Sequence, residues 1–302
     1  MTPPTGPPAA PPAAAVDALA ALRRHGRGLR GRRTALVAGA CVLALVLVVS
    51  LLTAVFGPAT TGQDLLQRLA APSWWPGGSP GHLLGTDSLG RDVFARIAEG
   101  ARTSLLIGLA AVAIAVVFGV AVGLLAGFAG GWVDAAFMRL ADAVLAIPTV
   151  LLALSVIAVV GGGIRNLVLV IAFSQWMTFA RNTRAVTLVQ REKLYTTAAR
   201  AAGAGNARIV LRHVLPHTLP STIVLATLNV SSAILVEAGL SFLGIGVQPP
   251  APSLGGMLSE GRQYVTGAPW LALFPGLAIF VLVLAVNVLG DGLRSHLDRE
   301  RP

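Results

Sequence analysis

Residues 103–128 read TSLLIGLAAVAIAVVFGVAVGLLAGF, a run that contains no charged side chain. A helix that crosses the hydrocarbon core of a bilayer needs about 20 predominantly apolar residues, and this run exceeds that length. Its many glycine residues are also usual in membrane helices. The run therefore predicts a membrane-spanning helix, and it sets the fold class for the chain around it.

The composition of the whole chain agrees with a membrane protein. Of its 302 residues 55% are hydrophobic and 12% are charged, with a mean hydropathy of +0.75, whereas soluble domains carry about 25% charged residues. This excludes an ordinary soluble enzyme, and the ample apolar surface excludes disorder over most of the chain. The net charge of +10 is typical of proteins that bind nucleic acid or a membrane surface. The apolar runs decide for the lipid bilayer and against nucleic acid.

Five further apolar runs predict membrane helices. They are Thr34–Phe56, Ala143–Val160, Asn166–Ala180, Leu219–Phe242 and Pro269–Gly290. The run that starts at Asn166 is charge-free over too few residues to cross a bilayer, so it spans only if its helix extends past Arg165 or Arg181. Pro148 and Pro275 lie within two of the runs, and membrane helices tolerate proline. We therefore predict an all-α integral membrane protein with six transmembrane helices.

The distribution of basic residues predicts the orientation. With the N-terminus in the cytoplasm, the cytoplasmic segments are residues 1–33, a turn over 129–142, the loop 181–218 and the tail after 290, and they carry 17 of the 23 basic residues. The positive-inside rule therefore favours both termini in the cytoplasm. The chain then divides into a Pro/Ala-rich and Arg-rich cytoplasmic tail (1–33), a first helix with an extracytoplasmic segment (34–102), a transmembrane core that includes the loop 181–218 (103–290), and a cytoplasmic tail (291–302).

The chain lacks the residues of common catalytic and metal sites. A phosphate-binding loop needs a lysine beside glycines, and the only lysine, Lys193, has no glycine nearby. His213 and His217 have the i, i+4 spacing of helical metal ligands, but Pro216 falls between them and no cysteine or carboxylate is near. The single Cys41 excludes an intrachain disulfide. We therefore expect no catalytic residues, no metal ligands, no cofactor bound by this chain and no enzymatic activity.

The loop 181–218 is the segment most informative about function. Within it, residues 195–204 predict a short helix that ends at Gly203. Asn206 is expected to cap a second short helix, Ala207–Val214, which Leu215-Pro216 stops. The expected product is a compact helix-turn-helix knob beneath the membrane. Such a knob either docks in a groove on a soluble partner or lies on anionic lipid, held by its arginines.

The same loop resembles the EAA loop of ABC importer permeases. That pattern is Glu-Ala-Ala, three residues, Gly, nine residues, an apolar residue, any residue, then Leu-Pro. The residues that fit this spacing are Ala198, Ala199, Gly203, Leu215 and Pro216. Two positions differ. Thr197 stands at the glutamate, which removes a carboxylate from the knob, and His213 stands at the apolar position, as is usual in the peptide branch of the family.

Three further segments narrow the resemblance. Gly85–Phe94 (GTDSLGRDVF), followed by Gly100–Leu105 (GARTSL), looks like the segment before the second span of dipeptide, oligopeptide and nickel permeases. Glu237–Gly244 (EAGLSFLG) with Gln248–Pro250 is similar to the end of their fifth span, and Gly290–Arg294 (GDGLR) is similar to their C-terminal signature. The resemblance covers nearly the whole chain and indicates the C-type subunit, which pairs with a B-type permease.

The resemblance implies a heteromeric importer in the cytoplasmic membrane of a bacterium. The chain would be a multi-pass subunit that pairs with a second permease, binds two ABC ATPases and receives substrate from an extracytoplasmic binding protein, while ATP and Mg²⁺ bind the ATPases. A peptide is the implied cargo. Nickel or a metal chelate is the alternative cargo, and an ATP-independent secondary transporter is the alternative class. The residues expected at the ATPase contact are Thr197, Ala198, Ala199, Arg200, Gly203, Arg212, His213, Leu215 and Pro216.

Three polar residues lie within the predicted spans, where such groups are candidates for function. Gln175 and Asn229 either line the translocation path or form hydrogen bonds between helices. Glu237 either lines that path or pairs locally, at the outer interface, with an arginine of segment 57–102. Before the second span, three charged residues either face the binding protein or tie down their own loop: Asp87, Arg91 and Asp92.

Overall fold

A computed structural model of the chain describes residues 36–53, 55, 62–78 and 80–297. Over these residues the fold is all-helical, apart from one isolated bridge between Thr86 and Asp92. The predicted tail 1–33 and residues 298–302 of the predicted tail 291–302 lie outside the described residues. The all-α prediction is confirmed over the described part of the chain.

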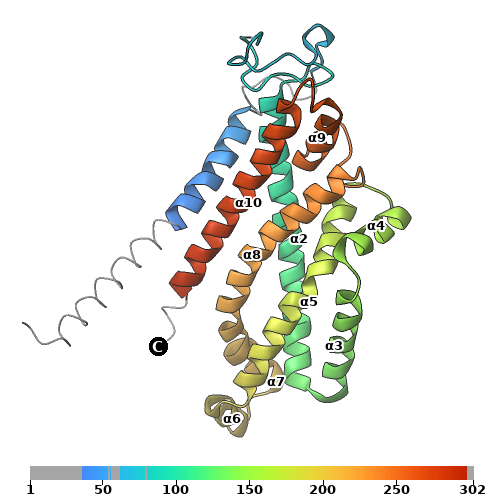
Figure 1. Cartoon of the computed structure of the whole chain (residues 1–302). Helices are drawn as coiled ribbons and strands as arrows, with labels where there is room; N and C mark the ends of the chain where they lie inside the picture. The colour runs from blue at the N-terminus through green and yellow to red at the C-terminus, as the bar shows by residue number, and fades with distance from the viewer. Residues whose placement is uncertain (1–35, 54, 56–61, 79, 298–302) are drawn as a thin grey trace, which may run out of the picture.

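The helices follow one another along the chain as Figure 1 shows. The first covers Leu36–Thr53. The later elements are η1 (Leu65–Gln67), α2 (Val93–Ala129), α3 (Gly131–Leu145), α4 (Thr149–Val160), α5 (Ile164–Arg191), α6 (Leu194–Ala201), α7 (Asn206–Ile209), η2 (Val210–Val214), α8 (Leu215–Phe242), α9 (Leu254–Gly261), η3 (Arg262–Tyr264) and α10 (Trp270–Leu297). η1 and η3 are 3-10 turns, whereas η2 is a π-helical turn.

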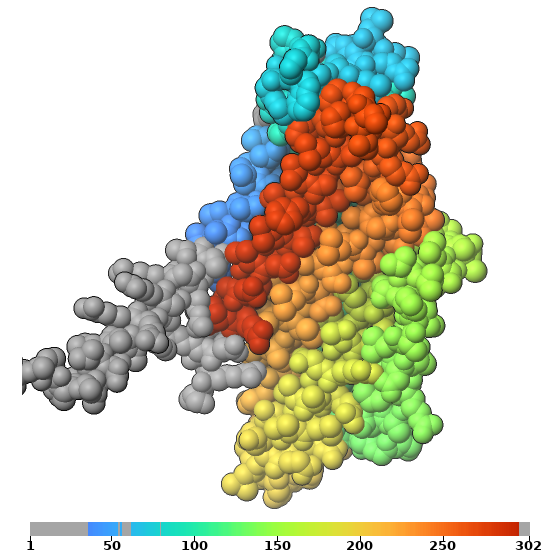
Figure 2. Space-filling model, viewed as in Figure 1, coloured from blue at the N-terminus to red at the C-terminus, as the bar shows by residue number. Residues whose placement is uncertain are grey.

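α2 is the central helix, with α5 and α8 packed along it (Figure 1). α10 packs on α8 and α9, and the helix Leu36–Thr53 lies against α10. α3 and α4 form the opposite flank. The space-filling view in Figure 2 shows residues 62–92 covering one end of the molecule and the segment around α6 forming the other. We call these the α9 end and the α6 end.

Four of the described helices are long and apolar enough to cross a membrane, and the bent pair of α3 and α4 makes a fifth if it is counted as one span. These four are Leu36–Thr53, Val93–Ala129, Asn206–Phe242 and Trp270–Ser295. α5 is not among them, because its helix is less apolar. It does extend past both Arg165 and Arg181, which is the condition that the short apolar run from Asn166 had to meet.

The turn predicted over 129–142 is wrong, because α3 occupies most of it, and the span predicted over Ala143–Val160 is broken between α3 and α4. Gly130 has a φ of 68°, and the chain reverses there directly from α2 into α3. α4 then starts after a bend of 90°. Pro148 explains the bend, because proline has no backbone N–H and its ring disfavours helical dihedral angles at the preceding residue, Ile147.

The most extensive helix contact joins α2 to α5 and depends on glycines spaced four residues apart in α2. A Cβ atom added at Gly119 would lie 2.4 Å from the backbone oxygen of Trp176, and one at Gly123 would lie 2.5 Å from that of Ala180. A Cβ at Gly127 would lie 2.8 Å from the nearest atom of α5. No side chain fits at such distances, so the two helix backbones touch along successive turns.

Other faces of α2 contact α8 and α9. A Cβ added at Gly108 would lie 3.1 Å from the Cγ1 of Ile234 in α8, and one at Gly100 would lie 3.3 Å from the backbone nitrogen of Leu254 in α9. Between Gly108 and Gly119 of α2, the small side chains of Ala111 and Ala115 are fully buried. A single helix therefore fixes the positions of three neighbours.

We expect Gly123→Ala to destabilise the chain, because the added methyl group must push the α5 backbone away. Overpacking costs about 1–3 kcal/mol, and it is measured as a lower midpoint of thermal unfolding, followed by circular dichroism in detergent. Gly239→Ala is the matched control, since Gly239 is also helical but exposed, with no atom within 4 Å of its Cβ position. Alanine there keeps or raises the midpoint. A Gly123→Ala midpoint at or above the parental value would contradict the close contact.

Candidate functional site

At the α6 end, a sharp break separates α5 from α6. Thr196 lies on the inner face of α6 and is fully buried. Its hydroxyl donates to the Gln190 carbonyl at the end of α5, at 2.8 Å. On the opposite face of α6, Leu194 is 85% exposed. α6 therefore turns one face toward the helix bundle and leaves the other uncovered.

α6 ends as the sequence predicts, at Gly203. The N–H groups of Gly203 and Ala204 donate to the carbonyls of Arg200 and Ala199, both at 3.0 Å, which is the hydrogen-bond pattern of a Schellman motif. Gly203 has a φ of 82°, a conformation that favours glycine. No heavy atom lies within 4 Å of a Cβ added there. The backbone conformation therefore requires glycine, and the surface beside it is open.

The second short helix does not stop at Leu215-Pro216, as the sequence predicted, and Asn206 does not cap it. Gly205 occupies the capping position, and α7 passes through η2 into α8 without interruption. The physical reason is the π turn. Its Leu215 N–H donates to the Val210 carbonyl, five residues back, and this wider turn accommodates a proline, which has no N–H to donate.

An aromatic stack fastens α6 to the start of α8. The rings of Tyr195 and His217 stack with centroids 5.6 Å apart and planes inclined by 17°, and the Tyr195 hydroxyl donates to the Gln190 side chain at 2.5 Å. His217 Nδ1 lies 2.8 Å from the His213 carbonyl, so a backbone group links these two histidines. The sequence analysis missed Tyr195, because no spacing rule relates it to His217.

The structure brings the predicted ATPase-contact residues together at the α6 end. The exposed ones are Thr197, Ala198, Arg200, Gly203, Arg212 and Pro216, and the partly buried ones are Ala199, His213 and Leu215. Ala199 and Leu215 pack on a small apolar cluster formed by Leu124, Ile209 and Val214. The set therefore has an exposed side, available to a partner, and an inner side that attaches the knob to α2.

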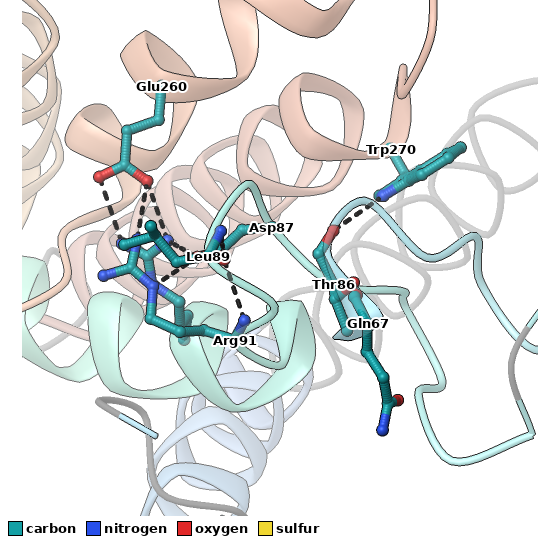
Figure 3. Close-up of polar contacts among 8 residues, drawn as sticks. Gln67, Thr86, Asp87, Leu89, Arg91, Glu260 and Trp270 are labelled. Carbon is teal, nitrogen blue, oxygen red and sulfur yellow. Dashed lines mark hydrogen bonds and ion pairs between the residues drawn. The ribbon is translucent and has the colours of Figure 1, made fainter. Parts of the chain in front are cut away.

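At the α9 end, the segment before α2 is folded around the buried carboxylate of Asp87 (Figure 3). Asp87 is 4% exposed and accepts the backbone N–H groups of Leu89 and Arg91 at 2.8 and 2.9 Å, and the Arg91 side chain at 2.6 Å. A Cβ at Gly90 would overlap the backbone of Asp64. Asp87 and Arg91 therefore tie down their own loop, which is one of the two roles that the sequence left open.

Arg96 carries this network from the loop to α9. It is buried and pairs with Asp87 and, at 2.9 Å, with Glu260 of α9, which Arg91 also approaches at 3.4 Å. Asp92 caps the start of α2 through its side chain. The sequence analysis missed the link between Arg96 and Glu260, because 164 residues separate them and no local pattern connects such distant positions.

Glu237 has the best-defined surroundings of the three polar residues predicted within spans. It is fully buried, and its two carboxylate oxygens accept the hydroxyls of Ser104 in α2 and Ser241 in α8, at 2.6 and 2.7 Å. The prediction that Glu237 pairs with an arginine of segment 57–102 is therefore wrong. Arg91 and Arg96 of that segment pair with Asp87 and Glu260 instead. Hydroxyl groups take that place.

Gln175 and Asn229 have different surroundings. Gln175 is 7% exposed, and its side-chain oxygen has no hydrogen-bond partner among the described residues. Asn229 is partly buried and donates to the Leu225 carbonyl of its own helix at 2.8 Å. The hydrogen bond of Asn229 stays within one helix, and the Gln175 oxygen makes none among the described residues. The place of these two residues in a translocation path stays a prediction.

Comparison with known proteins gives the class first. The chain belongs to the family of binding-protein-dependent transport system inner membrane components, whose sequence profile matches residues 119–301. Together with the long apolar helices, this membership makes it a multi-pass membrane permease.

Three individual relatives within this family are similar to the chain over most of its length. The di/tripeptide transport system permease protein DppC of Pseudomonas aeruginosa is 46% identical over 243 residues, 80% of each chain. The dipeptide transport system permease protein DppC of Alkalihalophilus pseudofirmus is 41% identical over 263 residues, 85% of this chain and 84% of the relative. The glutathione transport system permease protein GsiD of Salmonella typhimurium is 44% identical over 276 residues, 91% of this chain and 89% of the relative. An alignment of that length includes both the segment before α2 and the α6 end.

The pKa of Asp87 predicts how acid acts on the α9 end. Burial raises this pKa, but the hydrogen bond from the Arg91 backbone and the charge of Arg96 outweigh burial and hold it below its ordinary value. Such a group stabilises the fold above the pKa of the unfolded chain, about 3.9, and the stabilisation is lost as pH falls through the folded-state pKa. We therefore expect the segment 62–92 to loosen below about pH 4, measured by the fluorescence of its tryptophans.

Two substitutions sharpen this test. Asp87→Asn removes the charge from a buried ion-pair network, which costs about 3–5 kcal/mol, so the segment is less stable at neutral pH and the acid-dependent step disappears. Asp64→Asn is the matched control, since Asp64 is exposed and, among the described residues, its carboxylate bonds only within η1, to the Leu66 N–H and the Gln67 side chain. An unchanged acid curve in Asp87→Asn would show that another group governs the transition.

Proposed function

We propose that this chain is the C-type permease subunit of an ATP-driven importer that moves di- or oligopeptides across the cytoplasmic membrane of a bacterium. Relatives named for dipeptide, di/tripeptide and glutathione transport support a peptide cargo, since all three names denote short amide-linked compounds. The observation that carries the proposal is the uncovered face of α6, held by the Schellman motif at Gly203 within the segment that resembles the EAA loop. The chain forms the pore with a B-type permease, and catalysis belongs to other subunits.

Six spans with both termini in the cytoplasm fit the arrangement of the helices. The helix Leu36–Thr53, α2, the α3–α4 pair, α5, α8 and α10 alternate in direction between the two ends of the molecule, so Leu36 and the end of α10 lie toward the α6 end (Figure 1). The exposed side chains of Arg200, Arg208 and Arg212 lie at that end as well. The positive-inside rule makes it the cytoplasmic end.

The tip of α6 is the surface on which an ATPase docks. Leu194, Thr197 and Ala198 are exposed there and carry no charge. The Thr197 hydroxyl points back to the Lys193 carbonyl of its own helix, at 3.4 Å. Docking at this position therefore depends on shape and apolar contact and uses no salt bridge from residue 197. Two ABC ATPases bind this knob and its counterpart on the B-type permease, and they hold ATP and Mg²⁺; this chain binds no cofactor.

Coupling follows from the attachments of α6. Thr196 joins it to the end of α5, and the stack of Tyr195 on His217 joins it to the start of α8. When the ATPases close on ATP, a displacement of α6 therefore moves both membrane helices. ATP drives the exchange between inward-facing and outward-facing states because it binds one state more tightly than the other. An extracytoplasmic binding protein delivers the peptide at the α9 end.

Purification of the tagged chain from its native membrane in mild detergent tests this function. We expect two ATPases and a second permease to copurify, because the exposed α6 face requires a partner. The reconstituted complex takes up labelled di- or tripeptide only when ATP and the binding protein are present. ATP-independent uptake by the chain alone would support a secondary transporter instead, and uptake of nickel without peptide would overturn the cargo.

We expect Gly203→Asp to abolish peptide uptake, at least about tenfold below the parent, while membrane insertion stays intact. The open surface beside Gly203 faces the docking ATPase, so an aspartate adds bulk and charge to that contact. Gly205→Asp is the matched control. Gly205 is also exposed with no atom within 4 Å of its Cβ position, but it has an ordinary φ of −69° and caps α7, where aspartate is favoured. Parental uptake by a well-expressed Gly203→Asp variant would refute the docking role.

A further inference from the structure

A buried chain of hydrogen bonds joins three elements at the α9 end. Glu237 in α8 is fully buried, and its Oε2 accepts the Ser104 hydroxyl of α2 at 2.6 Å. Its Oε1 accepts the Ser241 hydroxyl, one turn later in α8, at 2.7 Å. Ser241 Oγ in turn accepts the backbone N–H of Val247 at 3.1 Å. The chain of bonds runs from α2 through α8 to residues 243–253, which we call the exit loop.

The backbone around this chain is closely packed. A Cβ added at Gly246 of the exit loop would lie 2.1 Å from Ser241 Oγ, and one at Gly255 of α9 would lie 2.1 Å from the Ala238 backbone oxygen. The exit loop and α9 therefore rest directly on the end of α8. A small displacement of Ser241 has to move the loop, because no free space separates them.

The exit loop forms one wall of a pocket of about 320 Å³ that opens at the α9 end. Ser241, Val247 and Gln248 line this wall, and Glu260 of α9 and Arg96 of α2 line another part of the pocket, which we call the second wall. The second wall is fixed by the Asp87 network described above. Two separate polar networks therefore hold the two walls of one pocket, and Glu237 anchors the wall that has no ion pair within the described part of the chain.

We propose that Glu237 is a positioning residue for transport: through Ser241 it holds the exit loop in the shape that the binding protein and its peptide meet at the α9 end. A carboxylate suits this role because it has two oxygens that accept hydrogen bonds. One accepts the hydroxyl of Ser104 in α2, and the other accepts that of Ser241 in α8. The nature of the cargo rests on the proposed function, whereas the effect of Glu237 on the loop does not.

The loop is tested in the assembled transporter with a single reporter cysteine. In a Cys41→Ala background, Val247→Cys places the thiol at a position that is 8% exposed in the parent chain, and the rate of labelling by a membrane-impermeant maleimide from outside is measured. We expect Glu237→Ala to raise this rate at least about tenfold, because local opening exposes the reporter. Glu237→Gln keeps one oxygen acceptor and gains an amide that donates to Ser241, so its rate stays within about threefold of the parent.

Thr103→Val is the matched control. Thr103 lies next to Ser104 in α2, but its hydroxyl donates to the Glu99 carbonyl of the same helix, so its loss leaves the labelling rate unchanged. Ser241→Ala cuts the bond to the loop and leaves Glu237 in place, and it is expected to raise the rate even where Glu237→Ala fails to accumulate. Parental labelling rates in both Glu237→Ala and Ser241→Ala would overturn the proposal.

A transport assay distinguishes positioning from a purely structural role, because only positioning changes the half-maximal concentration of binding protein while the maximal rate is kept. We expect Glu237→Ala to raise the concentration of peptide-loaded binding protein that gives half-maximal uptake about tenfold, with the maximal rate within about twofold, and Glu237→Gln to restore the parental value. An unchanged half-maximal concentration with a lower maximal rate would contradict positioning. A parental complex that takes up no peptide would instead overturn the proposed function, and the labelling rates would still decide the role of Glu237.

Discussion

The backbone contact between α2 and α5 is the constraint on which the rest of the structure depends. Lipid tails give helices little hydrophobic reason to associate, so close van der Waals contact has to hold them together, and Gly119, Gly123 and Gly127 provide it. α5 carries α6 at its far end, and α2 begins with Asp92 and Arg96 at the other. The separation and orientation of the two functional ends therefore follow from one helix pair.

The elements that the sequence predicted well are those whose causes are local. The charge-free run of α2 predicts a membrane helix from its own residues, and Gly203 predicts a left-handed turn at the end of α6. The effect of proline was ambiguous in the sequence, because Pro148 lies at a break between two helices, at the N-cap of α4, whereas Pro275 lies within α10. The outcome depends on whether neighbouring turns satisfy the carbonyl that a proline leaves free. Before Pro216 the chain makes a π turn in which the Leu215 N–H donates to the Val210 carbonyl, and the sequence around it did not predict this turn.

The polar contacts of the candidate sites were harder to predict, since they join positions far apart in the chain. Ser104 lies 133 residues from Glu237, and the expectation of an arginine partner for that carboxylate came from charge alone. In the folded chain Arg91 pairs with Asp87 in the loop before α2, and Arg96 of α2 pairs with Glu260 of α9. Sequence patterns could predict which polar residues are candidates for function, but only the packing of α2, α8 and α9 decides which of them pair.

The uninterrupted path from α7 through η2 into α8 has a mechanical consequence. This stretch of 37 residues, at about 1.5 Å per residue, is roughly 55 Å long, which exceeds the hydrocarbon thickness of a bilayer, about 30 Å. Under the proposed function this stretch is a lever held at one end beside α6, and Glu237 lies near its other end. A tilt of about 5° at the gripped end sweeps the other by roughly 5 Å over that length. Under that function, a displacement of α6 on the cytoplasmic side reaches the α9 end through the helix itself.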